Sequence, residues 1–174
     1  MGHEEHRRSS PRTVRVFVVT ASDTRTEAED SSGAFLREAV AAAGHAVAGY
    51  RLVRDEPAEV RAALAAAAEA QADAVIVNGG TGISARDRTY EAVAGILEKR
   101  IDGFGELFRM LSFAEIGSAA MLSRAVAGSW DGRAVFSVPG SSAAVRLAWE
   151  RLIGPELAHV VFELRKHGGS HGHA

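Results

Sequence analysis

Residues 73–82 read DAVIVNGGTG, a short apolar run that leads directly into a glycine-rich turn. A continuous apolar run bounded by turn residues is typical of a strand whose two faces are both buried. The runs Val14–Thr20 and Ala134–Val138 show the same pattern, and His45–Val53 fits a further strand. We therefore predict four strands, each followed by a turn and then by a helical segment.

Helical segments separate these strands. Apolar residues recur at helical spacing after the N-cap oxygens of residues 30–32, after Pro57 and after Thr89. Further helical segments are residues 103–128, which look helical in pieces, Ala143–Leu152, and a last helix from Pro155 to Gly168. Because parallel strands need crossover connections, this alternation predicts a three-layer, doubly wound α/β fold with a mainly parallel sheet and helices on both faces.

The composition limits the class of protein. The 174 residues are 47% apolar and 24% charged, with a formal net charge of −2, which is an ordinary balance for one folded domain. Cysteine is absent, which excludes disulfides, thiolate metal sites and cysteine nucleophiles. No basic block favours nucleic acid or a membrane surface, and no apolar run suits a signal peptide or a membrane helix, so we expect a cytoplasmic protein. We expect flexible tails at residues 1–12 and 167–174 on either side of one domain at 13–166.

Polar or glycine-rich turns follow three of the predicted strands. Ligands of open parallel sheets bind beyond the carboxyl ends of the strands, so we expect these turns to face one rim of the sheet. The three turns are Ser22–Asp23–Thr24, Gly79–Gly80–Thr81–Gly82 and Pro139–Gly140–Ser141–Ser142.

The Gly-Gly-Thr-Gly turn has the properties of an anion cradle. Glycine allows positive φ and a close approach of ligand to backbone, and the N–H groups then point at the anion. A β-branched side chain at Gly80 is expected to fill that approach and abolish binding. A plain strand-to-helix turn is the alternative, as a simple N-cap is for residues 139–142. The turn matches neither a Walker A loop nor the Gly-x-Gly-x-x-Gly of dinucleotide sites.

Two carboxylates stand close to these turns. Asp87 lies five residues past Gly82 and is expected to reach over the cradle, and Asp55 follows the second strand. Each alone could be an N-cap, but as a pair on one rim they could hold Mg²⁺, which prefers oxygen ligands and keeps waters and phosphates in its shell. The histidines are weaker candidates: His3, His6, His167, His171 and His173 lie in the tails, and His45 and His159 are expected at the surface or in packing.

These segments together resemble the molybdenum-cofactor biosynthesis family. Residues 78–92, NGGTGISARDRTYEA, resemble its Gly-Gly-Thr-Gly turn followed by Arg-Asp-x-Thr-x-Glu-Ala. Gly103–Ser112 with Met121–Ala125 looks like the next family block, and residues 139–142 look like its second ligand loop. The resemblance extends from Val14 to Leu164. Within it, residues 108–117 and 148–153 are most similar to the branch of B proteins.

The resemblance implies a function as well as a fold. It implies a domain related to the gephyrin G domain that assembles as a homotrimer or homohexamer and can work with other enzymes of the cofactor pathway. The implied reaction is adenylyl transfer: the terminal phosphate of molybdopterin attacks the α-phosphate of Mg-ATP, and pyrophosphate leaves. The family's catalytic aspartates match Asp55 and Asp87, its ligand loops match the turns at residues 79–82 and 139–142, and motif position puts Thr89 and Glu106 on the pterin side.

Two other functions stay open. Some members of the B branch lack the acidic pattern and are considered inactive, so the chain could be a non-catalytic protein that binds molybdopterin or a pathway partner. Both aspartates are present here, which favours activity. Related domains also occur in molybdenum-insertion enzymes and in a nucleotide-recycling pyrophosphatase, which usually carry additional domains.

Overall fold

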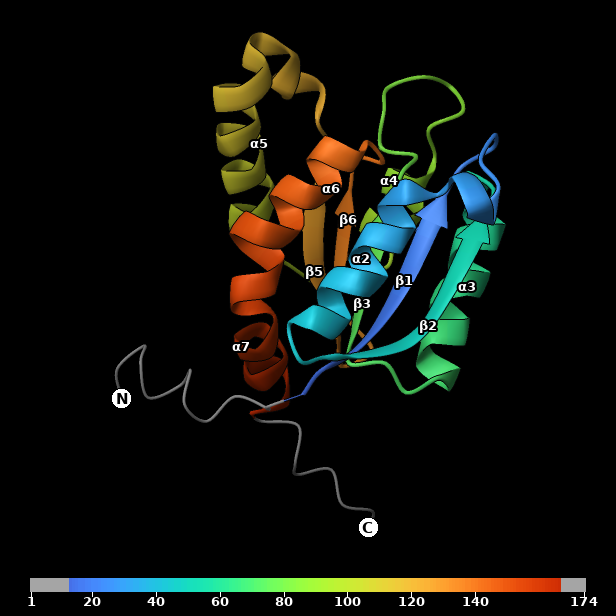
Figure 1. Cartoon of the computed structure of the whole chain (residues 1–174), viewed down its shortest axis with the longest axis vertical. Coiled ribbons are helices and arrows are strands. Elements are labelled where there is room, and N and C mark those ends of the chain that lie inside the picture. The colour runs from blue at the N-terminus through green and yellow to red at the C-terminus, as the bar shows by residue number, and fades with distance from the viewer. Residues whose placement is uncertain (1–12, 167–174) are drawn as a thin grey trace.

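The computed structural model describes residues 13–166, so the tails predicted at 1–12 and 167–174 lie outside the described residues. A six-stranded sheet of order β2-β1-β3-β6-β5-β4 forms the centre. Figure 1 shows this sheet between two layers of helices, so the predicted three-layer, mainly parallel fold is confirmed. The four parallel strands are β2 (Ala46–Val53), β1 (Arg15–Ala21), β3 (Ala74–Asn78) and β6 (Arg133–Val138).

Helices cover both faces of the sheet because each has one apolar side to bury. The helix α2 begins at the residue after Asp30, whose carboxylate accepts the Gly33 N–H at 3.0 Å and so caps it. No helix within residues 13–166 is long and apolar enough to cross a membrane. One face carries α2 (Ser31–Ala42), α5 (Asp102–Ile116), α6 (Ser142–Ala148) and α7 (Gly154–Arg165), and the other carries α3 (Pro57–Glu69) and α4 (Thr89–Ala94).

The structure corrects the helical prediction for residues 103–128. Only α5 and the 3-10 helix η2 (Gly117–Leu122) are helical there, and β5 (Val126–Trp130) then pairs antiparallel with β6. Asp131 and Gly132 join these strands with φ values of 46° and 71°. Two successive positive φ angles give the tight turn whose twist matches a hairpin, so the chain reverses here. The short β4 (Lys99–Arg100) extends the antiparallel edge.

The last two helices are continuous in the structure, where the sequence predicts two separate ones. The π-helical turn η3 (Trp149–Ile153) joins α6 to α7, and the Gly154 N–H donates to the carbonyl of Trp149 five residues back. Pro155 follows directly, and because proline has no N–H and its ring crowds the carbonyl four residues back, it fits this point where the hydrogen-bond pattern changes from π to α. The helix α7 ends at Arg165, and the predicted stop at Gly168 lies outside the described residues.

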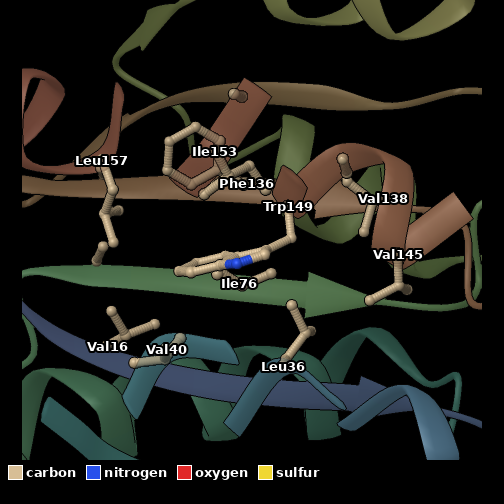
Figure 2. Packing of buried hydrophobic residues seen from close by; sticks show 14 of the residues in the cluster. Val16, Leu36, Val40, Ile76, Phe136, Val138, Val145, Trp149, Ile153 and Leu157 are labelled. Atoms are coloured by element: carbon tan, nitrogen blue, oxygen red, sulfur yellow. The ribbon is translucent and has the colours of Figure 1, made fainter. Parts of the chain in front are cut away.

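Two buried clusters hold the layers together. Ile76 of β3 belongs to the cluster under α2, α5, α6 and α7, while Val75 and Val77 of the same strand belong to the cluster under α3 and α4. Figure 2 shows the first cluster around Trp149, with Leu36 of α2 and Phe136 of β6 among its neighbours. Packing on both faces fixes the parallel strands in register, so the carboxyl ends of β1, β3 and β6 meet at one edge of the sheet.

Candidate functional site

The glycine turn after β3 fits tightly between the neighbouring strands. Gly79 and Gly80 have φ values of +100° and +61°, a region that favours glycine. A Cβ at Gly79 would stand 2.1 Å from the carbonyl oxygen of Ala21 at the end of β1. On the other side, the Gly79 N–H donates to the carbonyl of Val138 at the end of β6, at 3.0 Å. The turn is therefore held against both neighbouring strand ends.

The three predicted turns come together around one open pocket of about 380 Å³, which we call the main pocket. The turn after β1 contributes Ser22, the turn after β3 contributes residues 79–82, and the turn after β6 contributes Pro139 and Gly140. Asp87 also lines the pocket, and so do residues 122–123 at the end of η2. The three turns thus meet at one concave rim, as expected from the sequence.

Asp55 lies behind this turn and does not line the pocket. The residue is 7% exposed. One oxygen, Oδ1, accepts the N–H of Arg88 at 3.0 Å, the N–H of Thr89 at 2.8 Å and the Thr89 hydroxyl at 2.7 Å. Asp55 therefore caps the start of α4 across 33 residues of chain and leaves Thr89 buried beside it.

Asp87 lies beside the glycine turn, on the side that faces the pocket. Its Oδ2 accepts the Ser84 N–H at 2.9 Å, and the carboxylate packs against Gly82. The hydrogen bond from the Ser84 side chain, helped by the N–H groups of Ser84 and Gly82 and by the charge of Arg124, lowers the pKa of Asp87 below its ordinary value, although partial burial opposes this. The carboxylate is therefore ionised at neutral pH, and only a fall in pH through that lowered pKa would neutralise it.

Arg124 holds the segment between the glycine turn and α4, and the sequence analysis assigned it no role. Its Nε donates to the carbonyl of Thr81 at 2.9 Å, and its Nη2 donates to the carbonyls of Gly82 and Asp87. The guanidinium also pairs with Glu91 and lies over the Tyr90 ring, 4.6 Å from its centroid. One side chain thus ties together the two ends of the loop that carries Asp87.

Arg25 is a second residue to which the sequence analysis gave no role. It lines the pocket, donates through Nη2 to the carbonyl of Gly140 at 3.0 Å, and pairs with Asp30 at 3.6 Å. Burial alone would raise the pKa of Asp30, but hydrogen bonds from Thr20, Gly33 and Tyr50 and the charge of Arg25 together lower it. Arg25 is therefore anchored at the pocket edge and supplies a positive charge there.

The remaining predicted site residues lie elsewhere. Asp23 accepts the Asp55 N–H at 3.0 Å and lines a second pocket. Ser141 caps α6 through the Ala144 N–H, which agrees with the simple N-cap alternative. Ser142 is paired with the hydroxyl of Ser31. Glu106 lies on the second turn of α5 and lines a different pocket together with Tyr90 and Arg109. Neither Glu106 nor Thr89 is among the residues that line the main pocket.

The two histidines inside the described range have structural contacts. His45 accepts the Val14 N–H at its Nδ1, at 3.3 Å, and His159 pairs with Glu156 and Glu163. No group of three or more His, Asp or Glu side chains within residues 13–166 is arranged to hold a metal ion. The other five histidines lie outside the described residues.

The structure changes the expected effect of a side chain at Gly80. A Cβ there would stand 2.4 Å from Asp55 Oδ2 and 2.4 Å from the Thr89 hydroxyl, so it would point at the buried network. We expect Gly80→Ala to lower the free energy of unfolding by about 1–3 kcal/mol, because alanine at positive φ is strained and displaces Asp55. Urea unfolding measures this. Gly103→Ala is the control, because a Cβ at Gly103 meets nothing within 4 Å; equal stability of both variants would contradict the prediction.

Known proteins share both the sequence and the fold of this chain. Residues 17–159 match the family model "Probable molybdopterin binding domain". Molybdenum cofactor biosynthesis protein B of Halalkalibacterium halodurans is 54% identical over 168 residues, which cover 95% of this chain and 99% of that protein. A crystal structure of a molybdenum cofactor biosynthesis protein B has a TM-score of 0.86 at 52% identity, covering 91% of this chain and 99% of that chain. The tungsten cofactor synthesizing protein MoaB from Pyrococcus furiosus has a TM-score of 0.81 at 38% identity, covering 90% and 99%. The chain therefore belongs to the molybdopterin-binding domain family of the molybdenum cofactor biosynthesis proteins, as its motifs predict.

Proposed function

We propose that the chain is a cytoplasmic molybdopterin adenylyltransferase, which transfers AMP from Mg-ATP to the terminal phosphate of molybdopterin and releases pyrophosphate. The observation that carries this proposal is the composition of the main pocket. It combines the backbone amides of the glycine turn, the anchored guanidinium of Arg25 and the ionised carboxylate of Asp87. Membership of a molybdopterin-binding family supports molybdopterin as the acceptor.

The chemistry of the reaction suits such a site. An oxygen of the molybdopterin phosphate attacks the α-phosphorus of ATP, the bond from that phosphorus to the β-bridging oxygen breaks, and pyrophosphate leaves with this oxygen. Because the nucleophile belongs to the substrate, the protein has to position the phosphates and neutralise their charge. The N–H groups of Gly80 and Thr81 and the guanidinium of Arg25 are suited to that task.

Magnesium enters this reaction with ATP. An ion that arrives on a nucleotide takes most of its ligands from phosphates and water, so one protein carboxylate is enough to place it. Asp87 is our candidate for this carboxylate, because it faces the pocket.

We assign Asp55 a different task from the metal ligand expected at first. Its Oδ1 already accepts three hydrogen bonds, so it serves as a positioning residue that holds the turn.

We expect Asp87→Asn to slow pyrophosphate release from molybdopterin, ATP and Mg²⁺ by about a hundredfold or more, because the neutral amide binds magnesium poorly. Molybdopterin affinity should change little. The measurement is the rate of pyrophosphate release by the purified full chain. Asp102→Asn is the matched control, since Asp102 is an exposed acid at the start of α5.

One result would overturn the role of Asp87, and another would overturn the enzymatic proposal. If Asp87→Asn is as fast as the parent, Asp87 has no part in the chemistry. If the parent binds molybdopterin tightly but releases no pyrophosphate with any divalent metal, the chain is a binding protein of the B branch.

An assembly of three or six identical chains is the second part of the proposal. The outer side of α5 carries Leu107, Met110, Phe113 and Ile116, and η2 adds Met121 and Leu122; these side chains are between 46% and 78% exposed. The four residues of α5 recur at a spacing of three, so they spread over the half of the helix that faces away from the buried Phe104 and Phe108. We call these six residues the apolar stripe. Exposed apolar side chains gathered in this way are typical of an interface between identical subunits.

We expect Phe113→Glu to raise the dissociation constant of the assembly by about a hundredfold or more, because an unpaired charge would be buried in the interface. Light scattering over a dilution series measures the mass in solution. Glu115→Gln on the same helix is the control, because Glu115 is exposed and polar in the parent. A Phe113→Glu protein with unchanged mass at every dilution would exclude this stripe as the interface.

A further inference from the structure

A second pocket lies on the other side of the loop that carries Asp87. It has a volume of about 420 Å³ and is lined by Asp23, Arg54, Glu56, Ala85, Arg86 and Arg88. Arg86 and Arg88 precede and follow Asp87 in the chain, yet Asp87 lines the main pocket. The loop therefore separates the two pockets, with Asp87 on one side and Arg86 and Arg88 on the other.

The charge of this second pocket is only partly balanced by the protein. Arg88 pairs with Glu56 at 3.7 Å, and Asp23 accepts the Asp55 N–H at 3.0 Å. Within residues 13–166, no carboxylate forms an ion pair with Arg54 or Arg86. Two guanidinium groups thus face the same space without a partner of opposite charge. Planar guanidinium groups match phosphate oxygens well, since each can donate two parallel hydrogen bonds.

The position of the pocket indicates which phosphates it could take. In the proposed reaction the α-phosphate lies at Asp87, and the two leaving phosphates extend from it. The loop of Asp87 borders both pockets, so the second pocket is the neighbouring space into which a phosphate chain that starts at Asp87 would extend if it passes over the edge of the loop. The two carboxylates of the second pocket would repel a bare anion, so this pocket favours a diphosphate whose charge magnesium has partly neutralised.

We propose that Arg54, Arg86 and Arg88 form a diphosphate subsite, which holds the β- and γ-phosphates of the nucleotide and then the pyrophosphate that leaves. The subsite rests on the proposed function for the identity of the nucleotide. Recognition of a magnesium-bound diphosphate rests on the arginines alone and can be measured without any reaction.

The direct test is calorimetry of the full chain with pyrophosphate and Mg²⁺. We expect the parent to bind pyrophosphate, and the double variant Arg54→Gln/Arg86→Gln to bind it about tenfold or more weakly, because each arginine contributes charged hydrogen bonds. Arg61→Gln is the matched control, since Arg61 is an exposed arginine of α3 outside both pockets. Thermal unfolding checks that the double variant is folded. Equal affinity of parent and double variant for pyrophosphate would overturn the subsite.

Competition identifies the source of the diphosphate. If ATP displaces pyrophosphate while AMP does not, the subsite belongs to the nucleotide. If ATP and pyrophosphate bind together, the pocket takes free pyrophosphate and its assignment to the nucleotide is wrong.

Kinetics separates this inference from the function on which it rests. In the double variant we expect the KM for ATP to rise, with an unchanged affinity for molybdopterin. Adenylyl transfer with an unaltered KM would reject the subsite and keep the function. Loss of pyrophosphate binding in the double variant, with no transfer by the parent, would keep the subsite and reject the function.

Discussion

The site depends on three hydrogen bonds that converge on one oxygen of Asp55. The donors are the N–H groups of Arg88 and Thr89 and the Thr89 hydroxyl, all more than thirty residues further along the chain. A buried carboxylate is stable only where donors of this kind surround it. The space they leave has room for a glycine at position 80 and for no Cβ. The shape of the glycine turn, the start of α4 and the direction of the loop that carries Asp87 all follow from this contact.

Two arginine side chains hold the loops around this turn in place. Arg124 holds the loop of Asp87 against the glycine turn, and Arg25 joins the turn after β6 to the buried Asp30. The resulting pocket contains amides, one cation and one carboxylate, which is a set suited to phosphate groups. Leu122 both lines this pocket and belongs to the exposed apolar stripe, so the site reaches the surface that we propose for assembly.

The sequence predicts the parallel part of the fold well because buried strands and helices have clear apolar periods. It misses β5, whose Gly128 and Ser129 interrupt the apolar run, although the Asp131–Gly132 pair is a hairpin signal. The three turns are predicted as one rim because parallel strands all end at the same edge. The different positions of Asp55 and Asp87 are beyond sequence reasoning, since they depend on partners far along the chain. Arg25 and Arg124 belong to no periodic pattern, so only their contacts reveal them.

Amide hydrogen exchange tests the central position of Asp55 most directly. We compare the N–H groups of Arg88 and Thr89 with those of β3 in the parent and in Asp55→Ala. The account predicts that protection of Arg88 and Thr89 falls by about tenfold or more relative to β3, because their acceptor is lost. Unchanged relative protection of these two amides would contradict the claim that Asp55 holds the turn.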